Sequence, residues 1–233
     1  MPQMNQQTLL QLTDYLKEFA TEKRWNTLTK VAGKRTRYIT VAIEDIYQPH
    51  NASAVLRSCD GFGIQDVHII ENENEFDTSS QVTIGADQWL SLHRYKTPGK
   101  NNTVTCLDRL KDQGYTIIAT SPHENDTDLN DLNIDCKTAL IFGNEVDGIS
   151  DTVKERADGF VKIPMAGFSE SFNISVSAAI CLYDITLRLR KSDIPWQLSE
   201  DELDVLKYEW LKGSIKAGDK LEKQWLKKNP DMK

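Results

Sequence analysis

The sequence predicts an α/β fold, a mostly parallel sheet with helices on both faces. Its 233 residues, 39% of them hydrophobic, are enough to bury a substantial core. Apolar runs of strand length alternate with helical stretches, the pattern of a parallel sheet covered on both sides. Ligands of such sheets bind in the loops that follow the strands. The strand-like runs are 38–43, 66–70, 115–120, 139–142 and 160–163, and the helical stretches are 51–62, 103–112, 150–157 and 173–191.

The two ends of the chain are predicted to be helical additions to this core. Leucines at spacings of three and four predict an amphipathic helix over 8–20, with Thr8 as its cap. Beyond residue 196 the sequence becomes charged and dotted with aromatic residues, which predicts two helices around Gly213 and Gly218. We therefore expect an N-terminal extension (1–37), a core domain (38–192) and a C-terminal extension (193–233). The acidic stretch 71–80 is expected to be a surface loop.

Charge is distributed unevenly along the chain. The formal net charge is −7, but residues 1–37 carry seven Lys and Arg against three Asp and Glu. Residues 188–233 carry 11 against nine, so the middle, with 10 against 23, is strongly acidic. Basic ends around an acidic centre favour terminal helices that contact the phosphates of a nucleic acid, with the stretch 30–37 as one contact. Solvated helix faces of mixed charge would give the same composition.

Composition and motifs disfavour several classes of protein. No apolar run is long enough to cross a bilayer and no signal peptide is recognisable, so we expect no membrane association and a cytoplasmic location. The four cysteines are widely spaced and lack a Cys-x-x-Cys pair or clustered histidines, so neither disulfides nor a metal site is expected. The absence of a Gly-x-Gly-x-x-Gly fingerprint and of a P-loop disfavours nicotinamide and nucleotide-hydrolysing enzymes.

The segment 160–177 is the most informative part of the sequence. A short apolar strand ends at Pro164, a loop of small residues turns at Gly167, and a long helix follows. Ser171 and Asn173 are good N-cap residues, and a helix N-terminus left open in this way suits a polar or anionic group. The same two residues serve equally well as caps of a core helix, and this segment alone does not separate the two interpretations.

Two other segments follow predicted strands. In the first, Asn51 is placed to cap a helix and Arg57 lies in the middle of that helix. In the second, a strand ends at Gly143, Asn144 and Glu145, where a glycine allows a ligand to approach the backbone closely. Each has an ordinary structural alternative, a surface ion pair for a lone arginine and a turn for Gly-Asn-Glu.

Taken together, the three segments resemble the signature motifs of the SpoU branch of the SPOUT RNA methyltransferases. Asn51 with Arg57 is similar to the first motif, and Phe142-Gly143-Asn144-Glu145-Val146-Asp147-Gly148 to the second. The third corresponds to Ile163-Pro164-Met165 and Ser171-Phe172-Asn173 with the helix start after them. The resemblance covers nearly the whole chain, and the C-terminal extension is similar to that of members that act on tRNA. Phe172, where similar sequences usually carry Leu, and the long acidic stretch 71–80 depart from the pattern.

This resemblance implies a fold and an activity. The implied fold has a deep trefoil knot in the C-terminal part of the core, and the implied enzyme is a homodimer that needs no metal. The implied reaction transfers a methyl group from S-adenosylmethionine to the ribose 2'-hydroxyl of a guanosine in the D-loop of tRNA. The implied catalytic residues are Arg57, Asn51, Ser171, Asn173 and Glu145, and the implied cofactor contacts are Thr120, Gly143, Asn144, Ile163, Met165, Ser171 and Phe172.

In the implied dimer, Arg57 of one subunit approaches the cofactor held by the other. Arginines at this position have been regarded as the base, but a guanidinium, with a pKa above about 12, is a poor base. We therefore expect Arg57 to bind the target phosphate and to stabilise the developing alkoxide.

Two alternatives remain. A ribosomal RNA 2'-O-methyltransferase of the same family usually carries a separate N-terminal RNA-binding domain, for which 37 residues before the first strand are too few. A noncatalytic RNA-binding protein with this fold would be expected to lack Asn51, Arg57 or Asn173, and all three are present.

Overall fold

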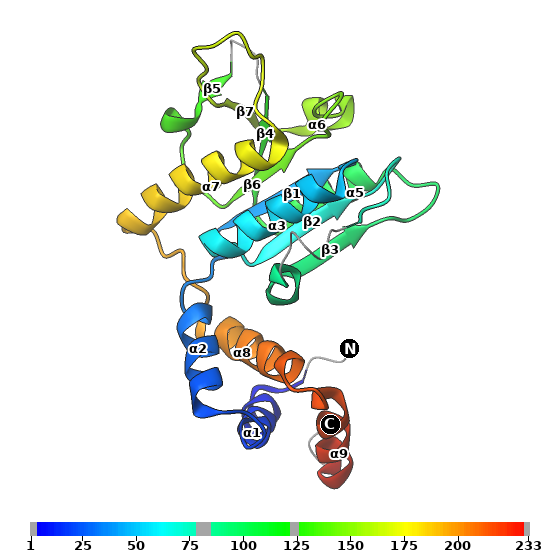
Figure 1. Cartoon of the computed structure of the whole chain (residues 1–233), viewed down its shortest axis with the longest axis vertical. Coiled ribbons are helices and arrows are strands. Elements are labelled where there is room, and N and C mark those ends of the chain that lie inside the picture. Colours follow the sequence, from blue (N-terminus) through cyan, green and yellow to red (C-terminus); the bar gives the residue numbers. More distant parts are fainter. Residues whose placement is uncertain (1–3, 78–84, 122–125, 231–233) are drawn as a thin grey trace. The chain divides into compact units, whose positions relative to one another are not determined.

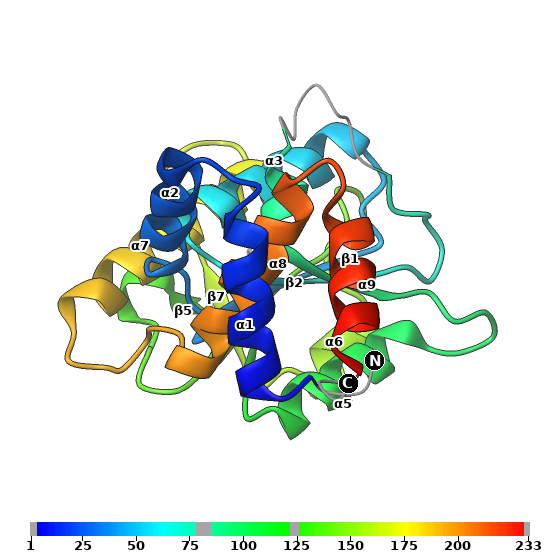
Figure 2. The ribbon, with the colours of Figure 1, turned by 90° about the horizontal axis from the view of Figure 1, so that it is seen from below.

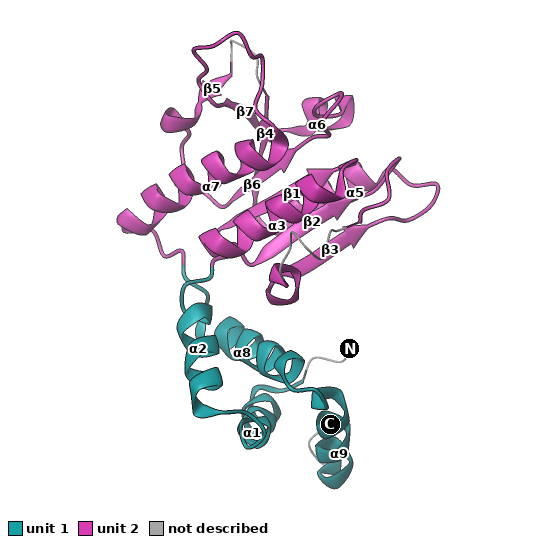
Figure 3. Cartoon of the chain, viewed as in Figure 1, with its two compact units in different colours: residues 1–35, 197–233 teal, residues 36–196 magenta. Residues whose placement is uncertain are grey.

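The computed structural model describes residues 4–77, 85–121 and 126–230. The chain forms two compact units, one made of residues 36–196 and the other of 1–35 with 197–233 (Figure 3). The larger unit holds the sheet and the smaller unit is helical. None of the helices in the described residues combines the length and the apolar character needed to span a bilayer.

The larger unit is built on a seven-stranded sheet in which every neighbouring pair is parallel (Figure 1). The strand order is β3-β2-β1-β6-β4-β7-β5. Because β1, β6, β4 and β7 are parallel, the loops after these four strands all leave from the same edge of the sheet, and because the strands are neighbours these loops start close together. The strands are β1 (Ile39–Glu44), β2 (Asp66–Ile70), β3 (Ser91–Tyr95), β4 (Thr116–Thr120), β5 (Thr127–Asp128), β6 (Thr138–Phe142) and β7 (Gly159–Lys162).

Helices cover both faces of this sheet. α3 (Pro49–Phe62) and α7 (Ile174–Lys191) pack together on one face, whereas α5 (Asn102–Asp112) and α6 (Asp151–Arg156) lie on the other (Figure 1). Side chains of a strand alternate between the faces, and β1 follows this rule. Val41 and Ile43 belong to the apolar cluster under α3 and α7, while Ala42 belongs to the cluster under α5 and α6. The described residues of this unit also form two short 3-10 helices, η1 (Ala86–Trp89) and η2 (Leu129–Asp131).

In the smaller unit, three helices of the described residues pack against α8. α8 (Glu200–Ser214) contacts α1 (Gln6–Lys17), α2 (Glu22–Ala32) and α9 (Gly218–Lys228) (Figure 1 and Figure 2). The buried side chains of α8 that form its core are Leu206, Tyr208, Trp210 and Leu211. Arg35 is also buried, at 2% exposure, with its guanidinium 5.1 Å from the centre of the Trp210 ring.

The α/β class and the parallel sheet are confirmed, whereas the trefoil knot stays a prediction. Several details differ from the sequence-based expectations. The helix expected over 8–20 is α1, which ends at Lys17 and is capped by Asn5 and not by Thr8. A second helix that the sequence does not predict, α2, follows it and extends into the stretch 30–37. α2 escapes detection because only Leu28 and Ala32 among its residues are buried. The sequence pattern also does not predict β3 or the two-residue β5.

The caps also differ from the prediction. α3 begins at Pro49 with Gln48 as N-cap, so Asn51 lies inside the first turn and does not cap the helix. Of the two proposed caps of α7, Asn173 is the N-cap and Ser171 lies outside the helix. Residues 71–77 carry no helix or strand, in agreement with the expected loop, and 78–80 lie outside the described residues.

Candidate active site

Three loops at the carboxyl edge of the sheet carry most of the predicted site residues. The first follows β1 and runs into α3, the second is the loop 143–150 after β6, and the third is the loop 163–173 after β7. The strands β1 and β6 are hydrogen-bonded neighbours, with Ile43 opposite Phe142. The first two loops therefore start next to each other, although about 100 residues separate them in the sequence.

A chain of side-chain hydrogen bonds joins one residue from each loop. Asn173 Nδ2 donates to Asn51 Oδ1 at 3.2 Å, and Asn51 Nδ2 donates to Glu145 Oε1 at 2.7 Å. Asn51 is 8% exposed, so its amide is largely removed from water and depends on these partners and on Gln48 Oε1, to which Nδ2 also donates at 3.4 Å. The side chain of Asn173 also caps α7, because its Oδ1 accepts from Ser175 N at 2.9 Å. The structure therefore brings together three of the five predicted catalytic residues, Asn51, Glu145 and Asn173.

The carboxylate of Glu145 binds the backbone of the first loop as well. Its Oε2 accepts from Tyr47 N at 3.1 Å and its Oε1 accepts from Gln48 N at 3.3 Å. Burial raises the pKa of Glu145, but hydrogen bonds from the Asn51 side chain and from backbone amides outweigh it, so the pKa lies below the ordinary value. Glu145 is therefore an ionised anchor between the first two loops.

The second loop makes a tight turn that requires glycine at its start. A Cβ on Gly143 would lie 2.0 Å from the carbonyl oxygen of Gly148, far inside van der Waals contact. Asn144 N donates to that same oxygen at 2.9 Å, and Asn144 Oδ1 accepts from the amides of Val146 and Asp147 at 2.8 and 2.7 Å. Gly148 has a φ of 72°, a left-handed conformation that glycine adopts without strain. The predicted cofactor contacts Gly143 and Asn144 thus shape this turn.

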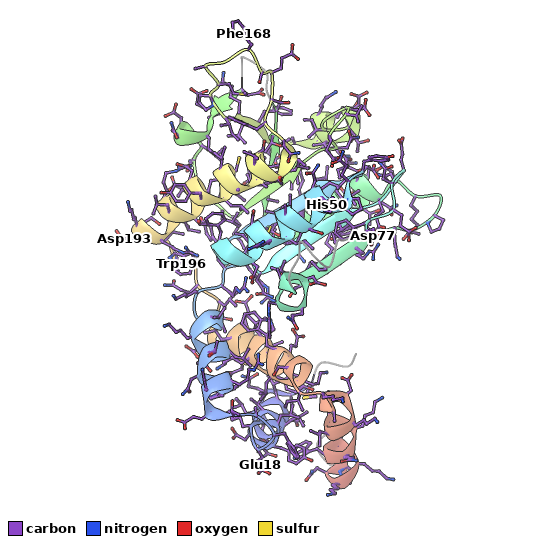
Figure 4. All side chains as sticks on the ribbon, viewed as in Figure 1. Glu18, His50, Asp77, Phe168, Asp193 and Trp196 are labelled. Carbon is purple, nitrogen blue, oxygen red and sulfur yellow. The ribbon has the colours of Figure 1, made fainter. Side chains whose placement is uncertain are left out.

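The third loop is open to solvent. Residues 164–172 make no main-chain hydrogen bond with any described part of the chain, so their amides and carbonyls are free to bind a ligand. Ile163 and Met165 are partly exposed and Phe172 is 40% exposed. Ser171 is exposed and stays outside the hydrogen-bond chain that joins Asn51, Glu145 and Asn173. Figure 4 shows Phe168 at the outer end of this loop, where its side chain is fully exposed.

Thr120 and Arg57 lie apart from that hydrogen-bond chain. Thr120 ends β4, between β6 and β7, and its hydroxyl donates to Ile141 O at 3.1 Å. Arg57 lies in α3 with an exposed side chain, and it forms no hydrogen bond or ion pair with a described residue. Its guanidinium is therefore available to a partner outside this chain.

Sequence reasoning missed residues that hold these loops in place. Glu44, the last residue of β1, is 2% exposed and binds Ser150 at the end of the second loop. The sequence did offer a sign of this role. Glu44 is a charged residue at the end of the mostly apolar strand Ile-Thr-Val-Ala-Ile-Glu, and a buried carboxylate needs specific partners. The backbone amides of Tyr47 and Gln48 carried no such signal, since their role depends on tertiary contacts alone.

A parallel sheet whose polar loops converge at the strand ends is the architecture of an α/β enzyme. Residues 38–183 match the model of the SpoU rRNA Methylase family. The chain belongs to this family, as its motifs predicted.

Individual relatives agree with this assignment. The tRNA (guanosine(18)-2'-O)-methyltransferase of Borreliella burgdorferi is 41% identical over 201 residues, 86% of this chain and 90% of that protein. The crystal structure of a TrmH/SpoU tRNA modifying enzyme from A. aeolicus has a TM-score of 0.73 and 28% identity, covering 83% of this chain and 98% of that one. The SpoU methyltransferase AviRb from Streptomyces viridochromogenes, solved with AdoMet, shares the fold, with a TM-score of 0.59 and 24% identity over 70% of this chain and 65% of that one.

Proposed function

We propose that this protein methylates the ribose 2'-hydroxyl of guanosine 18 in tRNA, the reaction named for its relative in Borreliella burgdorferi. The single observation that carries the proposal is the hydrogen-bond chain from Asn173 through Asn51 to Glu145. It joins all three motifs at one edge of the sheet, as a site shared by the three loops requires. As an enzyme acting on tRNA, it is expected in the cytoplasm.

The third loop fits the cofactor that such a reaction needs. An adenosine offers hydrogen-bonding groups at its edge and an apolar face, and the loop presents open main-chain groups beside Ile163, Met165 and Phe172. The tight turn at Gly143 and Asn144, together with Thr120 and Ser171, would complete the pocket. S-adenosylmethionine supplies a methyl group bound to a positively charged sulfur, and transfer of this group to a hydroxyl requires no metal ion.

The residues around this pocket have distinct proposed roles. Asn51 and Glu145 hold the first two loops together, and Asn173 sets the start of α7 against them. Ser171, exposed two residues before Asn173, would orient the attacking hydroxyl. Arg57, exposed and without a partner among the described residues, would bind the phosphate of the target nucleotide and stabilise the charge that develops on the ribose oxygen.

The active form is proposed to be a homodimer. α7 carries an apolar stripe at helical spacing on its exposed side, formed by Val176, Tyr183 and Leu187, with exposures of 43%, 59% and 39%. An isolated subunit would leave this stripe in water and Arg57 without a ligand. A second copy would cover the stripe and present its own Arg57 to the site, as the family resemblance implies.

The helical unit is proposed to bind tRNA. Lys220, Lys223 and Lys227 lie on one face of α9, are exposed, and form no ion pair with a described residue. The stretch 30–37 contributes less than its composition predicts. Arg35 is buried against Trp210, and Arg37 binds Asp66 with an Nε to Oδ2 distance of 2.9 Å, which leaves Lys30 and Lys34 as its exposed cations.

One experiment tests the proposed reaction. Unmodified tRNA and, separately, ribosomal RNA are incubated with the protein and S-adenosylmethionine labelled in its methyl group, and the methylated ribose is mapped by nuclease digestion and mass spectrometry. Label at guanosine 18 of tRNA is the expected result. Label on ribosomal RNA alone would favour the other branch of the family, and no label on either would contradict the proposal.

The dimeric site is tested by complementation. Arg57→Ala and Gly143→Ala subunits are each expected to be inactive, but a mixed dimer has one site with an intact arginine and an intact cofactor loop. Random mixing should therefore restore about a quarter of the wild-type rate. No recovery in verified mixed dimers would contradict the donation of Arg57 across the interface.

A further inference from the structure

Glu44 occupies an unusual position for a carboxylate. It is the last residue of β1, a strand whose residues are all buried, and it is itself 2% exposed. By alternation along the strand, its side chain lies on the same face of the sheet as Ala42, the face covered by α5 and α6. The carboxylate therefore lies between the first turns of these two helices.

Glu44 binds one residue from each of these helix starts. Its Oε1 accepts from the hydroxyl of Thr103 and from the hydroxyl of Ser150, the latter at 2.8 Å. Its Oε2 accepts from the backbone amide of Ser150 at 3.0 Å. A single carboxylate thus holds both donors of Ser150, which fixes the position and the orientation of that residue.

Ser150 is the end of the second site loop. It is also the N-cap of α6, since its Oγ accepts from Val153 N at 3.2 Å. The loop 143–150 is therefore attached to the end of β1 twice, through Glu145 to the residues after the strand and through Ser150 to Glu44. Between these two points the loop exposes Val146 and Asp147 to solvent.

The donors to Glu44 are all neutral, and no Lys, Arg or His within the described ranges forms an ion pair with it. A carboxylate buried among neutral donors contributes less stability than one paired with a cation, so its retention needs another explanation. Its contacts indicate one. The two carboxylate oxygens receive the amide and the hydroxyl of Ser150 at the same time, one donor on each oxygen.

We propose that Glu44 is a positioning residue of the methyl-transfer site, which holds the loop 143–150 in the conformation that binds the cofactor. The inference rests on the proposed function for the identity of that ligand. Glu44 touches neither substrate nor cofactor, and it acts through Ser150. An amide in its place offers one acceptor oxygen. If that oxygen keeps the Ser150 amide, the NH2 group faces the hydroxyls of Ser150 and Thr103, which must then accept instead of donate, and the loop end is held less firmly.

The test compares Glu44→Gln with Ser150→Ala and with the double variant. Each single variant is expected to weaken S-adenosylmethionine binding about tenfold in calorimetry, and the double variant no further, because both changes remove the same hydrogen bond. KM for the cofactor should rise by the same factor, while kcat at saturation changes little. Where Glu44→Gln fails to fold, Ser150→Ala and Thr103→Val still test the interaction, and Thr103→Val should have the smaller effect.

Glu71→Gln is the matched control. Glu71 is a carboxylate of 8% exposure directly after β2, and it binds Arg94 and Phe76 N, outside the three site loops. This control should lower stability without changing the affinity for the cofactor. An equal loss of affinity in both variants, or normal affinity in Glu44→Gln, would overturn the proposal.

Hydrogen exchange separates this inference from the proposed function. In the protein without cofactor, amides of 143–150 should exchange faster in Glu44→Gln than in the wild type, whereas those of 71–77 should not. Unchanged exchange in 143–150 would refute the positioning role whatever the enzyme methylates. Faster exchange in a protein that never methylates RNA would refute only the proposed function.

Discussion

Asn51 and Glu145 lie 94 residues apart in the sequence, yet Asn51 Nδ2 donates to Glu145 Oε1 at 2.7 Å. The bond joins the start of α3 to the loop after β6 because β1 and β6 are adjacent parallel strands. Asn51 also accepts from Asn173, so a single amide connects all three motifs. Its two ends have opposite roles, one donating to a carboxylate and the other accepting from an amide.

Asn51→Asp should impair the site more than its small change in size implies. Two carboxylates would face each other, and repulsion would separate the first two loops while raising the pKa of Glu145. We expect a loss of about 1–3 kcal/mol in the free energy of unfolding and at least a tenfold loss of methylation, measured by denaturant titration and a tritium-transfer assay. Asn133→Ala is the control, because Asn133 Oδ1 accepts from Asp135 N at 2.8 Å, outside the three loops. Comparable losses in the two variants would argue against a specific role for Asn51.

Gly143→Ala should distort the second loop. The added Cβ would lie 2.0 Å from Gly148 O and 2.3 Å from Ile149 N, both backbone atoms, so the turn must open. Overpacking of this kind costs about 1–3 kcal/mol. Thermal unfolding and cofactor titration should both show the effect. Gly61→Ala, whose Cβ meets nothing within 4 Å, should be neutral or slightly stabilising, and a neutral Gly143→Ala would show that the turn has more room than the structure gives it.

Stability should decline as the pH falls because of His68. Burial, and then the charge of His93, lower the pKa of His68 to about 3 from the ordinary value of 6.5. Below pH 6.5 the unfolded chain takes up a proton on His68, whereas the folded protein does not until the pH approaches 3. Protonation therefore favours the unfolded state in this range. The free energy of unfolding should therefore be highest above pH 6.5 and decline between pH 6.5 and about 3, by at most about 1.4 kcal/mol per pH unit.

Urea unfolding at several pH values checks this decline. The variant His68→Gln should flatten the curve between pH 5 and 6.5, a range in which Glu145 stays ionised because its pKa is lowered. Its stability at pH 7 will also change, since His68 Nδ1 lies 2.9 Å from Tyr95 Oη, so the slope and not the absolute value is the test. An unaltered slope would assign the pH dependence to other groups.

Removing the lysines of α9 should weaken tRNA binding without affecting the site. In a variant with Lys220, Lys223 and Lys227 all changed to Gln, affinity should fall. The slope of log K against log salt should also fall by about 0.7–0.9 for each phosphate that the variant no longer neutralises. Filter binding at several salt concentrations measures both quantities. The comparison variant has Gln at Lys23, Lys30 and Lys34, which are also exposed and form no ion pair with a described residue, so it loses the same charge.

If the helical unit binds tRNA only through total charge, the two triple variants will be equally weak. A larger effect in α9 would identify this helix as the main contact, whereas unchanged binding in the α9 variant would contradict the proposed role. Affinity for S-adenosylmethionine should be normal in both variants, since these lysines lie outside the unit that carries the site loops.

The class of fold and the three motifs follow from the sequence alone. Apolar strands such as Ala139–Phe142 have no other stable environment than the inside of a sheet, and their spacing leaves room for helices on both faces. The turn at Gly143 is equally readable, because local backbone geometry restricts which residues it accepts. α2 and β3 escape sequence reasoning because few of their residues are buried, two in α2 and one in β3, so their stability comes from packing on other elements and leaves a weak pattern in the sequence.

What the polar residues do depends on tertiary contacts that the sequence does not reveal. Asn51, a predicted helix cap, instead joins Glu145 to Asn173, and Arg35, a predicted surface cation, is buried against Trp210. Glu44 gains its role from Ser150, a partner 106 residues away. The type of a residue determines which hydrogen bonds its side chain is able to make. The strand order determines which partner lies close enough to make them. Because hydrogen bonds act only at about 3 Å, the sequence alone does not give the role of such a residue.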